Sequence, residues 1–317
     1  MAKTNTKVAG IDTAKAKLDI AVHDSTERWE LPNDKNGWRR LAQQLKEQGV
    51  GRIGIEATGG YERGVVEALR ACGFAVLVIQ PLQIKAFAAV KLRRAKTDRL
   101  DAGLIAEFAA FMDNDRPPPD PRSPAFADHL TFIEQAEEDL KRAKTRLEHQ
   151  REPRLRAKLE ADARVTRRRV TYEIDRLEAD LRQHPDLAAR LDLVLSIEGI
   201  GRRTALALII GMPELGRISR EQAASLAGLA PFDDRSANRV GEAHIAGGRA
   251  RVRTALYAAA LPAAYKWNPA LIALRTRLIA KGKEHKQALI ACARKLLIYA
   301  NAVLQRGEPW QKRPLES

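Results

Sequence analysis

Val8-Ala9-Gly10-Ile11-Asp12 and Lys17-Leu18-Asp19-Ile20-Ala21-Val22 decide the fold of the first part of this chain. The first stretch is a short apolar run that ends at an aspartate, and the second alternates polar with apolar residues. Together they predict a β-hairpin, with Trp29-Glu30-Leu31 as a third strand. The chain therefore begins with neighbouring strands that can form a sheet.

Helical and extended patterns alternate after these strands. Ile53-Gly54-Ile55 and residues 75–79 are the next predicted strands. Helices are predicted over 37–48, 61–71, 81–90 and 98–112. Three strands followed by helix, strand, helix, strand and helix predict an α/β domain with a mixed sheet over residues 1–112.

Composition sets limits on the class of protein. A chain of 317 residues with 45% hydrophobic and 30% charged residues has room for two globular domains. We found no run of about 18 apolar residues and no signal peptide, so we expect no membrane association. The only cysteines, Cys72 and Cys292, lack the spacing of metal ligands, which predicts a reducing cytoplasm and no structural zinc.

The charge of the chain is positive and uneven. The formal net charge is +15, made up of +5 in residues 1–112, zero in 113–190 and +10 in 191–317. Such a field favours a polyanionic partner, of which nucleic acid is the commonest. An acidic membrane surface is the other candidate, but neither terminus carries a basic amphipathic helix.

Four carboxylates in the first domain stand where they can meet. Asp12 and Glu56 each follow an apolar strand, and the ends of adjacent strands form the ligand crevice of open α/β sheets. Asp98 and Asp101 lie three residues apart at the start of a predicted helix, so they share one face. Carboxylates arranged in this way can hold two Mg²⁺ ions for phosphoryl transfer. Taken alone, Asp12 fits equally well as a turn residue and Glu56 as a solvated strand end, while Asp98 and Asp101 fit better as the start of a helix.

Residues around these acids support a nucleic-acid substrate. Arg93, Arg94 and Lys96 precede Asp98 and are predicted to contact a phosphate backbone. Gly54, Gly59 and Gly60, near Glu56, are expected to allow close approach of a bulky substrate. The order Asp, Glu, Asp-x-x-Asp resembles the RuvC-like branch of the ribonuclease-H fold.

The middle of the chain predicts a linker and an arm. Residues 113–124 contain five prolines, which exclude a helix or a central strand and indicate a stiff connector. Over 125–190, apolar residues recur at heptad spacing between many charges, which predicts a coiled-coil arm or helical hairpin broken near Pro153. Its net charge of zero favours self-association. Arginines between 164 and 169 fit a solvated helix face better than a phosphate site.

The last part, residues 191–317, is predicted to be mainly helical, with apolar helices at about 254–266, 269–281 and 284–305. Ile197-Glu198-Gly199-Ile200-Gly201 followed by Arg202 and Arg203 resembles a helix-hairpin-helix, whose glycines and helix N-terminus can meet a phosphate. Ser236 lies in a turn-rich stretch before a helix start that carries Arg249, Arg251 and Arg253. A serine there can attack a phosphate while arginines stabilise charge, although most loop serines are inert.

In this order, the motifs resemble one family closely, the insertion-sequence 110 transposases, also described as bridge-RNA-guided serine recombinases. The motifs span nearly the whole chain. They are Gly10-Ile11-Asp12, Ile55-Glu56-Ala57-Thr58-Gly59, Lys96-Thr97-Asp98-Arg99-Leu100-Asp101-Ala102, Ile197-Glu198-Gly199-Ile200-Gly201, Gly228-Leu229-Ala230-Pro231-Phe232, Ser236, Gly247-Gly248-Arg249 and Val252-Arg253.

The resemblance implies a function and a set of site residues. Asp12, Glu56, Asp98 and Asp101 would bind Mg²⁺, two ions per site, in a RuvC-like domain, and Ser236 would form a covalent bond to a DNA phosphate. A bridge RNA would pair with donor and target DNA, and the coiled coil would join dimers into a tetramer. The family's serine is usually followed by glycine, whereas Ala237 follows it here.

Two other functions are compatible with parts of this pattern. A RuvC-like metal-dependent nuclease of the junction-resolvase type would use the four acids without Ser236. A non-catalytic nucleic-acid-binding protein would use only the basic last third, but four carboxylates without a cation would repel DNA. We therefore expect a transposase that recombines DNA, in a bacterial or archaeal cytoplasm.

Overall fold

The computed structural model describes residues 7–91, 98–112, 120, 122–232, 235–236, 239–240, 244–245 and 247–311. Of residues 98–101 and of the described residues between 231 and 244, it describes the backbone alone. The chain divides into two compact units, Met1–Pro119 and Asp120–Ser317. Each unit has its own apolar core.

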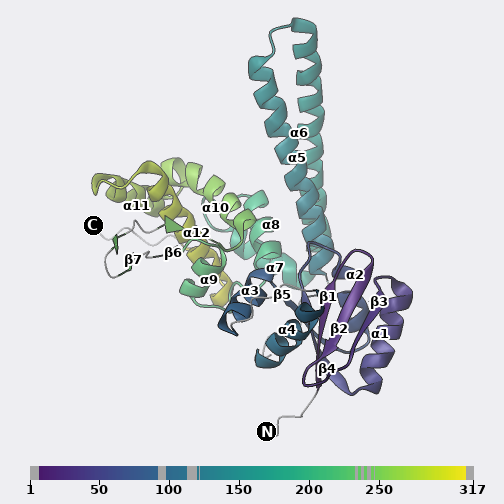
Figure 1. Ribbon diagram of the computed structural model, residues 1–317. Helices are drawn as coiled ribbons and strands as arrows, with labels where there is room; N and C mark the ends of the chain where they lie inside the picture. Colours follow the sequence, from purple (N-terminus) through teal and green to yellow (C-terminus); the bar gives the residue numbers. More distant parts are fainter. Residues whose placement is uncertain are drawn as a thin grey trace. The chain divides into compact units, whose positions relative to one another are not determined.

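The first unit is built on a five-stranded mixed sheet (Figure 1). Its strands are β1 (Lys7–Thr13), β2 (Lys17–Val22), β3 (Arg28–Pro32), β4 (Val50–Glu56) and β5 (Ala75–Ile79). The order across the sheet is β3-β2-β1-β4-β5. β1, β2 and β3 pair antiparallel, whereas β4 runs parallel to both β1 and β5. The predicted mixed sheet is confirmed.

Helices cover both faces of this sheet because side chains alternate along each strand. Ile11, Ile53 and Ile55 point into a core formed with α1 (Lys35–Glu47) and α2 (Arg63–Ala71). The opposite face carries Gly10 and Gly54, and packs against α4 (Asp98–Phe111). α3 (Pro81–Val90) also packs on α4, through Phe87 and Phe108.

The second unit begins with two long antiparallel helices, α5 (Ser123–His149) and α6 (Pro153–Arg182), which lie side by side (Figure 1). The predicted helical hairpin with a break near Pro153 is confirmed, and whether it acts as a coiled-coil arm between copies stays a prediction. Ile133 and Leu177 are fully buried in the core of this unit. The hairpin and the helices that follow it therefore share one core.

The remaining elements of the second unit are mostly helical, as predicted. They are α7 (Pro185–Leu195), α8 (Arg202–Gly211), α9 (Arg220–Leu226), α10 (Ala250–Pro262), the π-helix η1 (Ala263–Trp267), α11 (Pro269–Ala280) and α12 (His285–Arg306). Between α9 and α10 lie two-residue strands, β6 (Pro231–Phe232) paired with β9 (His244–Ile245), and β7 (Arg235–Ser236) paired with β8 (Arg239–Val240).

Two sequence predictions about the helices were wrong in detail. Pro124 belongs to α5, although the proline-rich stretch was expected to end after it. A proline is tolerated there because the amide groups of a helix's first turn have no intrahelical acceptor. A single α-helix was expected over 254–266, but the chain widens into η1 after Pro262.

α12 is long and apolar enough to cross a membrane by length and composition alone. Half of that stretch is buried inside the unit, and Leu289, Leu296 and Leu297 pack in its core. We interpret α12 as a core helix.

Candidate functional site

Asp12 and Glu56 end two adjacent parallel strands. β1 and β4 are in register from Ala9 with Ile53 to Ile11 with Ile55, so Asp12 and Glu56 are the next aligned pair. Because Ile11 and Ile55 face the α1–α2 core, the two acids face the opposite side, which α4 covers. Both side chains are partly buried and have interactions within the protein.

α4 lies unusually close to the sheet on this side. A Cβ atom at Gly10 would overlap the backbone of Ala102 and Ala106, and one at Gly54 would lie 2.7 Å from the Cβ of Ala109. Gly54 was expected to make room for substrate, and this expectation was wrong, because the space is filled by α4. Glycine is needed here for close packing of helix on sheet.

The direction of α4 brings its first turn to the end of the sheet where Asp12 lies. Its later residues run back along β4, since Ala109 lies at Gly54 and the guanidinium of Arg52 donates to the carbonyl of Met112. Asp98 precedes Ala102 by one turn, about 6 Å of helix, and Asp12 follows Gly10 by a similar distance of strand. The backbone therefore carries Asp98 and Asp101 toward the strand ends.

The four predicted acids are only partly described at the level of side chains. Those of Asp98 and Asp101 lie outside the described residues. Among the side chains that are described, no three metal-ligating groups gather in one place. The donor set is nevertheless all carboxylate oxygen, which suits Mg²⁺.

Asp19 is a further acid on this face that sequence reasoning missed. It lies directly opposite Asp12 across β1 and β2, so both side chains emerge on the same side. Its carboxylate is 3.1 Å from the ammonium of Lys17, which also contacts Glu30 at 3.0 Å. The signal was the polar alternation in β2, which marks Lys17 and Asp19 as neighbours on one face.

Hydrogen bonds hold the loops that follow β1 and β4. Glu62 accepts from the backbone amides of Thr58 at 3.1 Å and Gly60 at 2.8 Å. Burial raises the pKa of Glu62, but these hydrogen bonds outweigh it and leave the pKa below its usual range. The Asn33 amide donates to the carbonyls of Ala14 at 2.9 Å and Tyr61 at 3.1 Å, and so ties the two loops together.

Ser236 lies in the segment between α9 and α10, which we call the serine loop. Contacts between its two ends hold them together. Its backbone pairs with Arg239, while its side chain, like Ala237, lies outside the described residues. At the base of the loop, Gly228 and Gly248 both have positive φ. A Cβ atom on Gly228 would overlap the backbone of Gly247, and one on Gly248 would overlap the backbone of Gly228. The Arg253 guanidinium donates to the carbonyls of Ala227 at 3.1 Å and Gly247 at 2.6 Å.

Most of the arginines predicted to contact nucleic acid have acidic partners inside the second unit, and Arg93, Arg94 and Lys96 lie outside the described residues. Arg202 bonds Glu178 and lies 2.7 Å from Asp175. Burial raises the pKa of Glu178, but hydrogen bonds from Arg202 and Arg182 outweigh it and lower the pKa.

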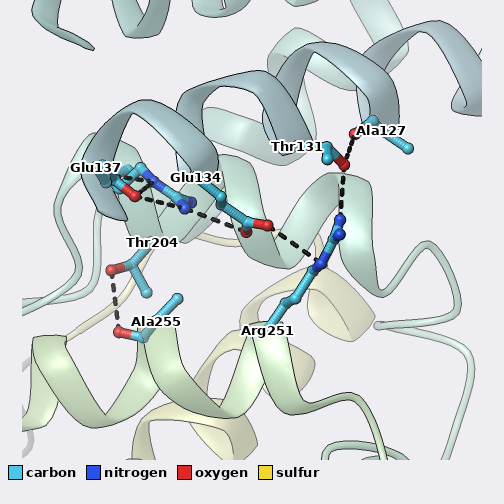
Figure 2. A network of polar contacts seen from close by, with 8 residues as sticks. Ala127, Thr131, Glu134, Glu137, Thr204, Arg251 and Ala255 are labelled. Atoms are coloured by element: carbon cyan, nitrogen blue, oxygen red, sulfur yellow. Dashed lines mark hydrogen bonds and ion pairs between the residues drawn. The ribbon is translucent and has the colours of Figure 1, made fainter. Parts of the chain in front are cut away.

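Arg203 and Arg251 join α8 and α10 to α5 through one network (Figure 2). Arg203 donates to Glu137 at 3.0 Å and to Glu134 at 3.2 Å. Arg251 lies 3.2 Å from the same Glu134 and donates to the hydroxyl of Thr131 at 2.6 Å.

These contacts have an electrostatic reason. Arg202 and Arg203 open α8, and Arg251 and Arg253 stand in the first turn of α10; neither turn contains an acid. A cation at a helix N-terminus meets the positive end of the dipole. Carboxylates from α5 and α6, and carbonyls at the serine loop, offset this repulsion. Arg249, just before α10, is likewise bound to Glu214 at 2.6 Å and to the carbonyl of Gly211 at 2.8 Å.

Two family models match the chain. One, a DEDD transposase model of insertion-sequence 110 elements described as "Transposase", covers residues 9–159. The other, described as "Transposase IS116/IS110/IS902 family", covers residues 191–276. The matches fall in both compact units and include Asp12, Glu56, Asp98, Asp101 and Ser236.

Curated relatives agree with these models along almost the whole chain. The pilin gene-inverting proteins of Moraxella bovis and Moraxella lacunata are each 28% identical over 318 residues, covering 96% of this chain and 97% of theirs. Among solved structures, T. thermophilus RuvC in complex with Holliday junction substrate is similar at 18% identity and a TM-score of 0.28, over 34% of this chain and 94% of that one. The chain belongs to the insertion-sequence 110 family of transposases.

Proposed function

We propose that this transposase rearranges DNA by cutting strands and rejoining them to new partners, with Ser236 as the nucleophile. The name of its Moraxella relatives, pilin gene-inverting protein, describes a rearrangement of this kind. The observation that supports the proposal is that Asp12 and Glu56 end adjacent strands and that the backbone of α4 directs its first turn toward the same end of the sheet.

The covalent step exchanges one phosphodiester bond for another. The Ser236 hydroxyl oxygen bonds to phosphorus, the bond from phosphorus to one deoxyribose oxygen breaks, and that oxygen takes up the proton. Attack by the hydroxyl of another strand then reverses the step and releases the serine. No external energy source is needed, because one phosphate ester replaces another.

The acids would hold the cofactor, a pair of Mg²⁺ ions. Asp12, Glu56, Asp98 and Asp101 supply hard oxygen donors, and bound Mg²⁺ would stabilise charge on the phosphate. Contacts at the base of the serine loop support a second role for this chain's residues, which is to position Ser236. Arg253 and the close contact of Gly228 with Gly248 would limit where Ser236 can travel.

A trapped covalent adduct tests the nucleophile. We expect the protein to form an adduct with labelled DNA on denaturing gels, and Ser236→Ala to abolish both adduct and recombinant product. Ser225→Ala, an exposed serine on α9, is the matched control and should retain both. Normal recombination by Ser236→Ala would overturn the serine mechanism.

Asp12→Asn tests the acidic site. We expect strand exchange to be lost while the thermal transition is kept, and Asp24→Asn, in an exposed turn, to remain active. Chelation should abolish exchange and Mg²⁺ should restore it. Exchange that survives either change would contradict the proposal.

The guide RNA and the oligomer rest on the family resemblance. We propose a bridge RNA that pairs with donor and target DNA, and a dimer or tetramer joined through α5 and α6. Sequencing of RNA that co-purifies with the protein tests the first, and light scattering of the complex tests the second. Activity of an RNA-free monomer would contradict both.

A further inference from the structure

Two large aromatic side chains are exposed on the rigid segment η1. Tyr265 is 44% exposed and Trp267 is 57% exposed, while their neighbours Ala263 and Ala264 are fully buried. The buried side chain of Asn268 donates to the carbonyl of Glu198 at 2.9 Å and accepts from the amide of Leu271. The backbone that carries the aromatics is therefore anchored in the core, and π-helical turns often mark functional sites.

Tyr265 is held by residues from two other helices. The guanidinium of Arg275, on α11, lies 3.9 Å from the centre of its ring. Its hydroxyl shares a hydrogen bond with Nε2 of His285, at the start of α12. The three side chains bring η1, α11 and α12 to one exposed cluster.

Basic residues are frequent in the part of the chain that carries this cluster, and several have no acidic partner among the residues that the structure describes. Residues 263–295 contain eight Lys or Arg residues and a single acid, Glu284. Lys266, Arg277, Lys281, Lys283 and Lys286 are exposed. None of these five side chains makes a hydrogen bond or ion pair with an acid among the residues that the structure describes. They differ in this from Arg202 and Arg203 of α8 and from Arg251 of α10.

We propose that this surface, the η1–α12 surface, binds unpaired nucleotides of a nucleic acid. Trp267 would stack on an exposed base, and Lys281, Lys283 and Lys286 would contact the neighbouring phosphates. Aromatic platforms beside basic side chains are how proteins bind single strands, because every base has a π-face and a duplex does not offer it. The cationic lysines lie beyond residue 276, outside both family-model matches.

Substitution of Trp267 tests the stacking. Binding of the full-length protein to labelled 20-nucleotide U and T strands, and to a 20-base-pair duplex, is measured by fluorescence anisotropy. We expect Trp267→Ala to weaken single-strand binding about tenfold, while Trp267→Phe retains most of it and duplex binding is unchanged. Unchanged single-strand binding, or an equal loss on duplex, would overturn the proposal.

Charge reversal tests the phosphate contacts. Lys281→Glu, Lys283→Glu and Lys286→Glu together should lower the slope of log affinity against log salt by about 2 on single strands. The matched control reverses three exposed lysines of the helical hairpin, Lys141→Glu, Lys144→Glu and Lys158→Glu, for the same change in net charge. An equal effect in the control would show that the overall positive charge of the protein, and not this surface, determines the salt dependence. That result would overturn the proposal.

The two strands distinguish the sources of the ligand. Preference for U strands that depends on Trp267 identifies RNA, and preference for T strands that depends on Trp267 identifies single-stranded DNA; both uphold the surface. The inference does not depend on the serine chemistry, because binding is measured without catalysis. Single-strand binding and strand exchange are measured separately, so failure of this proposal and failure of the proposed function appear in different experiments.

Discussion

The arginines of α8 and α10 and the basic residues of the η1–α12 surface look alike in the sequence but differ in the structure. Arg203, Arg249 and Arg251 bind carboxylates of the same unit. Lys281, Lys283 and Lys286 have no acidic partner among the described residues. The first group joins helices, and the second is available for phosphate. Positive charge therefore locates a nucleic-acid surface only when its internal partners are known.

Arg203→Ala should have the largest effect on stability. It leaves Glu134 and Glu137 without their main cation in a site where Arg203 is 24% exposed and Glu134 is 21% exposed. We expect a loss of about 2–3 kcal/mol in the free energy of unfolding, measured by urea denaturation. Arg277→Ala, which removes an arginine that has no acidic partner among the described residues, should change it by less than about 0.5 kcal/mol. A stable Arg203→Ala protein with weakened nucleic-acid binding would place Arg203 in the second group.

Arg249→Ala should have the next largest effect. Arg249 makes a bidentate hydrogen bond with the Glu214 carboxylate and also donates to the carbonyl of Gly211, but its side chain is 35% exposed. We expect a loss of about 1–2 kcal/mol in the free energy of unfolding. Arg249→Lys keeps the positive charge but cannot make the bidentate contact, so it should restore only part of the lost free energy of unfolding. Full rescue by lysine would mean that charge alone matters at this position.

Asp186→Asn should have a small effect that depends on pH. The Arg122 hydrogen bond lowers the pKa of Asp186 to about 2. A carboxyl whose folded pKa is depressed stabilises the protein above its unfolded pKa, and this contribution is lost as pH falls from about 4 to about 2. Because Asp186 is 59% exposed, we expect less than about 1 kcal/mol at neutral pH. An NMR titration with a midpoint near 4 would contradict the paired state.

Replacement of Lys281, Lys283 and Lys286 by alanine should have the smallest effect on stability. Since these side chains have no acidic partner in the part of the chain that the structure describes, we expect the free energy of unfolding to change by less than about 0.5 kcal/mol for each. Affinity for single strands should fall in the same variant. Marked destabilisation without a change in affinity would show that the two groups are alike.

Much of the fold could be predicted from the sequence because it rests on local patterns. The strands 75–79 and the helix 81–90 were predicted with their observed bounds, and the break at Pro153 separates α5 from α6. Alternation and turn residues act over short distances, so they can be read without tertiary structure. Asp12 and Glu56 could be identified as strand-end acids for the same reason.

The contacts of the site residues could not be predicted. Gly54 was assigned to substrate approach, whereas α4 occupies that space. Asp19 was missed because its position opposite Asp12 depends on the register of β1 and β2. The partners of Arg203 are 66 and 69 residues away along the chain, beyond the reach of any local pattern.

The sequence by itself determined the α/β character of the first part, the helical hairpin, the turn-rich stretch that carries Ser236 and the excess of positive charge. Only the tertiary structure decided which of those charges are neutralised. Ion pairs between distant residues depend on how helices pack, and packing is set by the buried faces of several elements at once. The same reason explains why Trp267, unremarkable in sequence, stands exposed once η1 is anchored in the core.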